Sequence, residues 1–180
     1  MKIVTIGRGN VGAGLAGLWR SAGHEVEGLG RGGGDVSGAD VVLVAVPGEQ
    51  ISPALSTVSG LPGKIAIDAT NVLPERHGDF PSYTEEVKSF TRAPVAKSFN
   101  MNFARLFGAV GQQRVRPSNW YVADQGAVEV TEQLITDAGY DPVRVGDLSR
   151  ARDFENAVWL LMGAQPVGEV FYRFATPGQL

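Results

Sequence analysis

The sequence contains no cysteine and only two histidines among its 180 residues. The missing thiols exclude disulfide bonds, thiolate metal sites and a cysteine nucleophile. His24 and His77 are too few imidazoles for a histidine-built metal site, so we expect no metal centre. Any chemistry must therefore come from other side chains or from a bound organic cofactor.

Long apolar runs and a strong excess of one charge are also missing. No stretch reaches the roughly 18 apolar residues of a membrane span. The first apolar run starts at residue 3, meets glycine at once and lacks the cleavage site of a secretory signal. The net charge of −3 gives no reason to expect nucleic acid or an anionic membrane as a partner. We expect a cytoplasmic protein with neither of these partners.

The composition that remains is that of a globular protein. Hydrophobic residues make up 43% of the chain and charged residues 19%. The length is about that of one domain and is sufficient to bury a core. The sequence contains no internal repeat and no clear linker, so we predict a single domain over residues 1–180.

Short apolar runs alternate with helical stripes along the chain. Runs of apolar and β-branched residues bounded by turn formers predict strands at Lys2–Ile6, Glu25–Leu29, Asp40–Val46, Lys64–Asp68, Pro94–Phe99, Asn119–Ala123 and Pro142–Val145. Apolar spacing and caps predict helices from Val11 to Ala22, over about 49–59, over roughly 83–90 behind a Ser82–Glu85 capping box, from Ala127 to Ala138 and from near Ser149. The glycine tract at 30–38 is predicted to be a shortened crossover without a helix. This alternation predicts a doubly wound α/β domain with a mainly parallel sheet.

Gly7, Gly9 and Gly12 form a G-x-G-x-x-G motif between the first predicted strand and the first predicted helix. In that context the motif indicates a Rossmann-type domain that binds NAD(P). The first glycine permits a tight turn, the second lets a pyrophosphate approach the backbone, and the third lets the helix pack close to the strand. Asn10 and Val11 then begin a helix whose free N–H groups face the phosphates. The alternative is a glycine-rich turn without a ligand.

A second feature bears on which dinucleotide would bind. About 20 residues after the motif, NAD-binding domains carry an acidic residue that holds the ribose 2′-hydroxyl. This chain has Gly30 and Arg31 there instead. A guanidinium pairs with the 2′-phosphate of NADP, which a carboxylate would repel. We predict that Arg8 and Arg31 clamp this phosphate and favour NADP(H); two solvated surface arginines are the alternative.

Ligands of such sheets bind outside the carboxyl ends of the strands. The further cofactor-binding candidates at these ends are Val46, Pro47, Thr70 and Asn71, and the acceptor-site candidates are Lys97, Ser98, Phe99, Asn100 and Leu148. Strand alternation allows Lys97 to face a ligand or to point away equally well. Asn71 and Asn100 would bond the nicotinamide amide or an acceptor ring, or else satisfy loop backbone. No residue is predicted with certainty to be catalytic.

Three further expectations concern residues outside this set. Asp68 is expected to cap a turn. Arg152 and Glu155, at i and i+3 on the last predicted helix, are expected to form a surface pair. The apolar tail "VWLLMGAQPVGEVFYRF" is explained equally well by a homodimer interface and by a core helix.

The motifs together resemble the NADP-dependent oxidoreductases that use the deazaflavin coenzyme F-420. They are also similar to the cytosolic NADPH reductase domain of the membrane metalloreductases. The resemblance rests on "GRGNVG", "GHEVEGLGR", "VVLVAVP", "DATNVL", "VAKSFN" and "GDLSRARDFE", which occur in the family's order over nearly the whole chain. It implies a small-molecule redox acceptor, a flavin or deazaflavin, reduced by hydride transfer from NADPH.

The sequence departs from this pattern in three places. Val72 stands where the family commonly has proline, and Asn100-Met101 stands where the deazaflavin enzymes carry His-Thr. The segment between the second and third strands is shorter than theirs. The sequence shows no transmembrane segment, so a membrane metalloreductase is not expected.

Two other functions compete with this interpretation. The first is a reductase of a small imine or carbonyl substrate, although such enzymes add a large helical domain and only about 35 residues follow the last predicted strand here. The second is a binding protein that senses NADP(H) without turnover, which the small number of catalytic side chains would suit.

Overall fold

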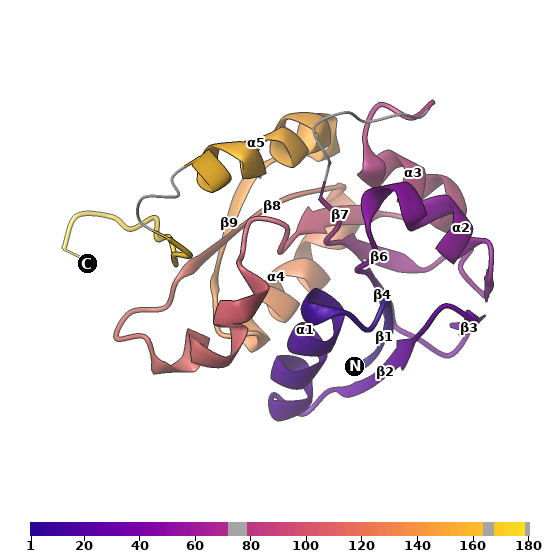
Figure 1. Cartoon of the computed structure of the whole chain (residues 1–180), viewed down its shortest axis with the longest axis horizontal. Coiled ribbons are helices and arrows are strands. Elements are labelled where there is room, and N and C mark those ends of the chain that lie inside the picture. Colours follow the sequence, from indigo (N-terminus) through magenta and orange to yellow (C-terminus); the bar gives the residue numbers. More distant parts are fainter. Residues whose placement is uncertain (72–78, 164–167, 179–180) are drawn as a thin grey trace.

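The computed structural model describes residues 1–71, 79–163 and 168–178. Seven strands form one sheet in the order β2-β1-β4-β6-β7-β8-β9 (Figure 1). Their bounds are β1 (Lys2–Ile6), β2 (Glu25–Leu29), β4 (Val41–Val44), β6 (Ile65–Asp68), β7 (Val95–Ser98), β8 (Ser118–Ala123) and β9 (Asp141–Gly146). Each predicted strand is therefore confirmed to within a few residues.

Helices connect these strands. The α-helices are α1 (Asn10–Ser21), α2 (Ile51–Leu55), α3 (Tyr83–Thr91), α4 (Val128–Asp137) and α5 (Ala151–Gly163). The 3₁₀ helices are η1 (Gly48–Gln50), η2 (Ala104–Gln112), η3 (Gln125–Ala127) and η4 (Leu148–Arg150). The Ser82 hydroxyl accepts a hydrogen bond of 3.0 Å from the Glu85 amide, so the predicted cap of α3 is confirmed.

The sheet is mainly parallel, as predicted. The exception is the pair β7–β8, which is antiparallel, so β8 and β9 run against the other strands. Strands β2 and β4 lie on opposite sides of β1, so the chain reverses its winding direction at β1. In sheets of this kind the reversal leaves a crevice at the carboxyl ends of the central strands.

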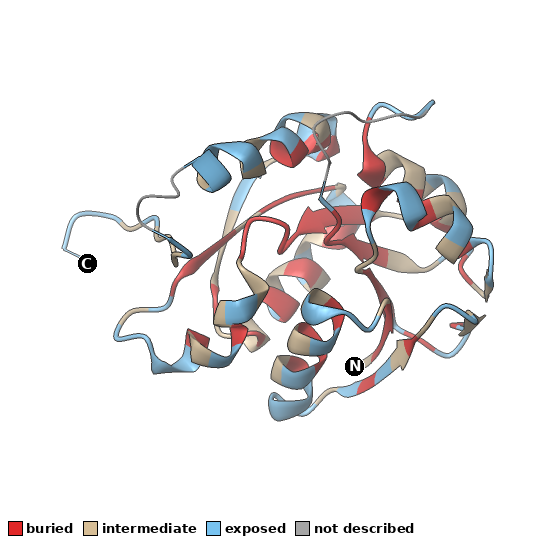
Figure 2. Cartoon of the chain, viewed as in Figure 1, coloured by how far each residue is buried: buried red, intermediate tan, exposed pale blue. Residues whose placement is uncertain are grey.

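Helices cover both faces of the sheet, and the core lies between the layers (Figure 1, Figure 2). Trp19 of α1 and Leu134 of α4 pack with Ile3 and Leu43 on one face. The Trp19 Nε1 donates to the Leu134 carbonyl at 2.8 Å and ties these two helices together. Helices α2, α3 and α5 supply the apolar side chains of the other face. The strands are buried on both sides, which explains their nearly continuous apolar sequences.

Two segments differ from the sequence prediction. The helix expected over about 49–59 ends at Leu55, because the next residues form β5 (Val58–Ser59), which pairs with β3 (Gly34–Asp35). The Val36 amide of the glycine tract donates to the Ser59 carbonyl at 2.9 Å. Helix η2 was not predicted at all. His77 and Val72 lie outside the described residues.

The apolar tail contributes to the core and also reaches the surface. Val158, Leu161 and Tyr172 of the tail pack against the core, whereas Trp159, Leu160, Met162 and Phe174 are exposed. The core interpretation therefore holds for one part of the tail. A homodimer interface formed by the exposed part stays a prediction. None of the helices in the described part of the chain has the length and apolarity to cross a membrane.

Candidate functional site

The three glycines of the loop after β1 meet different surroundings. Gly7 has a φ of 107°, and a Cβ there would lie 2.2 Å from the Ala45 carbonyl oxygen. A Cβ at Gly12 would lie 2.1 Å from the Gly7 oxygen, so this glycine lets α1 approach the strand end. A Cβ at Gly9 would meet no atom within 4 Å. The loop is thus tight where it packs against protein and open where a ligand would approach.

The N-terminus of α1 opens at the same place. Gly9 is its N-cap residue and supplies no side-chain cap, and the first turn carries no acidic residue. The first amides of a helix have no partner within the helix, and they form the positive end of its dipole. This helix end can therefore bind an anion through its backbone N–H groups.

Two adjoining cavities follow the carboxyl ends of the strands. The larger, of about 910 Å³, lies over the ends of β1 and β2, and the smaller, of about 340 Å³, extends past β4 to the residues after β6. Among the predicted cofactor-binding residues, Gly7, Arg8, Gly9, Arg31, Val46 and Pro47 line the larger cavity, while Gly9, Asn10, Val11, Val46, Pro47, Thr70 and Asn71 line the smaller. Gly12 packs beneath the loop instead. The structure therefore brings these residues together along one groove, and their role in binding stays a prediction.

The two predicted arginines lie at the outer end of this groove. The Arg8 guanidinium lies against Gly30, directly after β2, and Arg31 is the next residue in the chain. Both arginines are exposed. Within the described ranges, no carboxylate lies within ion-pair distance of either guanidinium. Two cations that have no ion-pair partner in the described part of the chain therefore line the same cavity.

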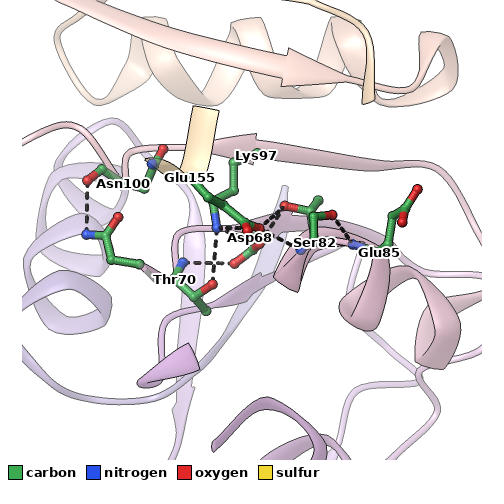
Figure 3. A network of polar contacts seen from close by, with 9 residues as sticks. Asp68, Thr70, Ser82, Glu85, Lys97, Asn100 and Glu155 are labelled. Carbon is green, nitrogen blue, oxygen red and sulfur yellow. Dashed lines mark hydrogen bonds and ion pairs between the residues drawn. The ribbon is translucent and has the colours of Figure 1, made fainter. Parts of the chain in front are cut away.

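A buried ionic network lies under the inner end of the groove (Figure 3). The Lys97 ammonium lies 2.8 Å from Asp68 Oδ2 and 3.6 Å from Glu155 Oε1, and all three side chains have 0% exposure. It also donates to the Thr70 hydroxyl at 3.1 Å. The side chain of Lys97 therefore points into the interior, where it holds Thr70 from below.

Asp68 and Glu155 receive further donors in the same network. Asp68 accepts from the Thr70 amide and from the Thr84 hydroxyl, each at 2.8 Å, so its predicted role in capping a turn is confirmed. Glu155 accepts from the Thr84 amide at 3.2 Å. The prediction of a surface pair between Arg152 and Glu155 was wrong, because this face of α5 is turned toward the sheet and the buried Lys97.

The remaining acceptor-site candidates mostly have interior partners. The Ser98 hydroxyl donates to Asn119 Oδ1 at 3.0 Å. Phe99, with a φ of 64°, packs edge-on against Trp19 at a centroid distance of 5.8 Å. Leu148 belongs to the apolar core. None of these side chains lines the two cavities, and a contact with an acceptor stays a prediction for them.

Asn71 and Asn100 meet at the inner end of the groove. The Asn71 Nδ2 donates to the Asn100 backbone carbonyl at 3.1 Å, which is the backbone role considered for Asn71. The Asn100 side chain is 4% exposed, and its amide atoms have no hydrogen-bond partner among the described residues. An unpaired buried amide is costly. Among the described residues Asn100 therefore keeps unused hydrogen-bonding capacity, although it lines neither of the two cavities.

A third cavity, of about 230 Å³, lies beside the residue that follows Asn100. It is lined by Met101, Trp120, Ala157, Leu160, Leu161, Tyr172 and Phe174. The Tyr172 hydroxyl accepts from the Trp120 amide at 3.2 Å and donates to Asn102 Oδ1 at 3.3 Å. Burial raises the pKa of Tyr172, which keeps its hydroxyl protonated. This cavity suits an apolar group.

Sequence reasoning missed several residues of these cavities. Gly30, Ala45, Gly48, Glu49, Gln50, Pro53 and Ala54 also line the groove. The position of Pro47 at the end of β4 could have indicated the residues after it, because loops at carboxyl ends surround such sites. The apolar cavity gave no sequence signal, because β8 and the residues after α5 are far apart in the chain. In the described ranges, no three potential metal ligands cluster.

Solved structures similar to this chain share its fold. A proposed F-420-dependent NADP-reductase from Arthrobacter sp. FB24 is 24% identical, with a TM-score of 0.78 over 98% of this chain and 100% of its own. A hypothetical protein from Sinorhizobium meliloti is 23% identical, with a TM-score of 0.63 over 83% and 86%. An imine reductase from Streptomyces aurantiacus is 12% identical, with a TM-score of 0.63 over 93% of this chain but 61% of its own.

These similarities confirm the α/β fold, and one of these structures is described as an F-420-dependent NADP-reductase, the family that the sequence motifs resemble. The imine reductase is longer, and this chain spans about three-fifths of it. No protein-family model matches the chain. No curated protein is significantly similar to it.

Proposed function

We propose that this protein is an NADP(H)-dependent oxidoreductase that transfers hydride between the nicotinamide and a flavin- or deazaflavin-like acceptor. One observation carries the proposal. Two exposed arginines, Arg8 and Arg31, face the cavity at the end of β2, where a domain selective for NAD has a carboxylate. This cavity continues from the open glycine loop. Such a site fits a dinucleotide with a phosphate on its ribose.

Different residues along the groove would bind different parts of the dinucleotide. The amides at the start of α1 and the bare backbone of Gly9 would hold the pyrophosphate. Arg8 and Arg31 would hold the 2′-phosphate by charge-assisted hydrogen bonds. Val46 and Pro47 form an apolar wall between the two cavities, and Thr70 lies at the inner end of the groove.

Hydride transfer to such an acceptor does not require a strong general acid or base from the protein. Bound NADPH supplies a hydride, two electrons with one proton, so that it is oxidised to NADP⁺ while the acceptor is reduced. The protein's contribution is to hold donor and acceptor in register. Lys97 and Asp68 fix Thr70 from below, and Asn100, whose buried amide has no hydrogen-bond partner among the described residues, lies next to Asn71 at the inner end. Such a site needs no histidine or cysteine.

The nature of the acceptor is supported by two lines of reasoning. The full-length structural neighbour is described as F-420-dependent, which favours a deazaflavin or flavin. The apolar cavity between Met101, Trp120 and Leu161 would suit a flat ring system near the same end of the sheet. An imine or carbonyl substrate is the second candidate, because the fold is shared with imine reductases.

An oxidation assay tests this proposal. Purified protein is mixed with NADPH, and absorbance is followed while FMN, FAD, deazaflavin F-420, a cyclic imine or a ferric chelate is added. Oxidation of NADPH with a flavin or deazaflavin supports the proposal, and oxidation with the imine alone transfers it to the second candidate. Tight NADPH binding without oxidation by any acceptor would make the protein a sensor. Failure to bind NADPH overturns both the enzyme and the sensor.

A further inference from the structure

We infer that Gly30 is a specificity-determining residue, because the absence of a side chain there leaves a seat for the Arg8 guanidinium beside the larger cavity. This inference rests on the proposed NADP(H) function and adds to it. It assigns discrimination between the two dinucleotides to a pair, Arg8 and Gly30. The role of Gly30 is to leave free of any side chain the space that the Arg8 guanidinium occupies.

The Arg8 side chain follows a bare face at the end of β2. Residues 28 and 30 lie on the same side of an extended chain, because side chains alternate along a strand. A Cβ at Gly28 would lie 3.1 Å from Arg8 Cγ and 3.3 Å from Cδ. A Cβ at Gly30 would lie 2.4 Å from Arg8 Nη2, 3.0 Å from Cζ and 3.1 Å from Nε. The two glycines thus form a track, with the arginine stem over the first and the guanidinium over the second.

The backbone itself does not require glycine at this position. Gly30 is not among the glycines with a positive φ, in contrast to Gly33, whose φ is 70°. An alanine at position 30 could therefore adopt the same backbone conformation. What it could not do is leave the guanidinium where it lies, because a real Cβ does not approach another heavy atom to 2.4 Å. Gly30 therefore leaves the space that the exposed tip of Arg8 occupies, and a Cβ there would move that tip.

The identity of residue 30 would consequently set the charge at this end of the groove. The end of β2 is where NAD-selective domains place a carboxylate. A carboxylate at position 30 would displace or pair with Arg8, remove a free positive charge and offer an acceptor to a ribose 2′-hydroxyl. Glycine does the opposite, because it lets the arginine of the glycine loop reach over the end of β2. Arg31, the next residue, lines the same cavity and adds a second cation.

A double-mutant cycle tests this inference. Dissociation constants for NADPH and NADH are measured by calorimetry for wild type, Gly30→Ala, Arg8→Ala and the double variant. We expect Gly30→Ala to weaken NADPH binding about tenfold and to leave NADH binding within about twofold, because a charge-assisted contact to the 2′-phosphate is lost. The double variant should bind NADPH no more weakly than Arg8→Ala, because the two changes remove the same interaction.

Two further variants complete the experiment. Gly17→Ala is the matched control, since it lies on the exposed side of α1 and its Cβ would meet no atom within 4 Å. Gly30→Asp should lower the preference for NADPH over NADH more than Gly30→Ala does. Unfolding curves show that each variant is folded.

The outcomes separate this inference from the proposed function. Equal losses for NADPH and NADH in Gly30→Ala, or additive losses in the double variant, would overturn the role of Gly30 while leaving NADP(H) binding in place. Wild-type protein that binds neither nucleotide would overturn the proposed function and this inference together. A wild type that prefers NADPH, with Arg8→Ala sensitive and Gly30→Ala insensitive, overturns the inference alone.

Discussion

At the scale of single residues, the glycines of the loop were the most predictable part of the site. Their expected tasks follow from covalent geometry, and the structure gives each a measurable cause: the φ of Gly7, the contact of Gly12 with the Gly7 oxygen and the open space at Gly9. The seat for Arg8 was not predictable. A sequence shows which residues are glycines, but not which distant side chain occupies the space that they leave.

The same geometry predicts opposite effects for two glycines of α1. Gly12→Ala places a Cβ 2.1 Å from the Gly7 oxygen, which would push the helix off the strand at a cost of about 1–3 kcal/mol of unfolding free energy. Gly17→Ala meets no atom and should stabilise the helix by roughly 0.5–1 kcal/mol, since alanine loses less backbone entropy. Urea unfolding measures both. If the two variants shift stability in the same direction, the close contact at Gly12 is not the constraint.

Charged residues were harder to place than glycines. Alternation left Lys97 with two equal orientations, and spacing put Glu155 on a surface pair with Arg152. The structure instead buries both, because each gains partners from elements far away in the chain: Asp68 on β6 and Thr84 on α3. A buried charge is tolerated only with such partners, and a single sequence does not show which residues they are.

At the scale of elements, the buried network connects β6, β7, α3 and α5 beneath the inner end of the groove (Figure 3). Its polar bonds also fix the turn that carries Thr70. The network thus couples the packing of α5 to the shape of the site. A change in its charge balance should affect stability before it affects any ligand contact.

A pair of lysine variants tests this coupling. Lys97→Met leaves two buried carboxylates without their ammonium and should lower the unfolding free energy by about 3–5 kcal/mol. Lys88→Met is the control: Lys88 forms an ion pair of 2.8 Å with Asp124, but its side chain is 42% exposed. We expect a loss of less than about 1 kcal/mol there. Guanidinium unfolding compares the two, and similar losses would contradict a buried ionic role for Lys97.

The bounds of the helices were harder to predict from the local sequence pattern than the bounds of the strands. The strands of the main sheet could be located because each is a buried apolar run between turn formers. Helix α2 was overestimated because the residues after Leu55 pair with the glycine tract in β3–β5, a non-local contact that overrides local helix preference. Helix η2 packs against α1, and its buried residues Phe107 and Val110 are three residues apart, which is a helical spacing. The sequence therefore carried a signal for this helix that the prediction missed.

At the scale of the whole molecule, the strand order determines where a ligand would bind. The chain runs from β1 to β2 on one side and then returns past β1 to β4 on the other side, and the groove lies over this reversal. Alternation of strands and helices in the sequence was sufficient to predict this class of sheet. The antiparallel pair β7–β8 was not predicted. The connection through η2 does not return the chain to the edge of the sheet where β7 begins, so β8 runs in the opposite direction to β7.

The central claim is that this groove selects NADP(H) through Arg8 and Arg31. The most direct test is the ratio of the dissociation constants for NADH and NADPH, measured by calorimetry for the wild type and for the Arg8→Ala/Arg31→Ala variant. Each charge-assisted contact contributes roughly 1.5–3 kcal/mol, so the wild-type ratio should exceed about 100 and fall to within a few-fold of unity in the variant. A wild type that binds NADH and NADPH equally, or a variant that weakens both to the same extent, would contradict the account.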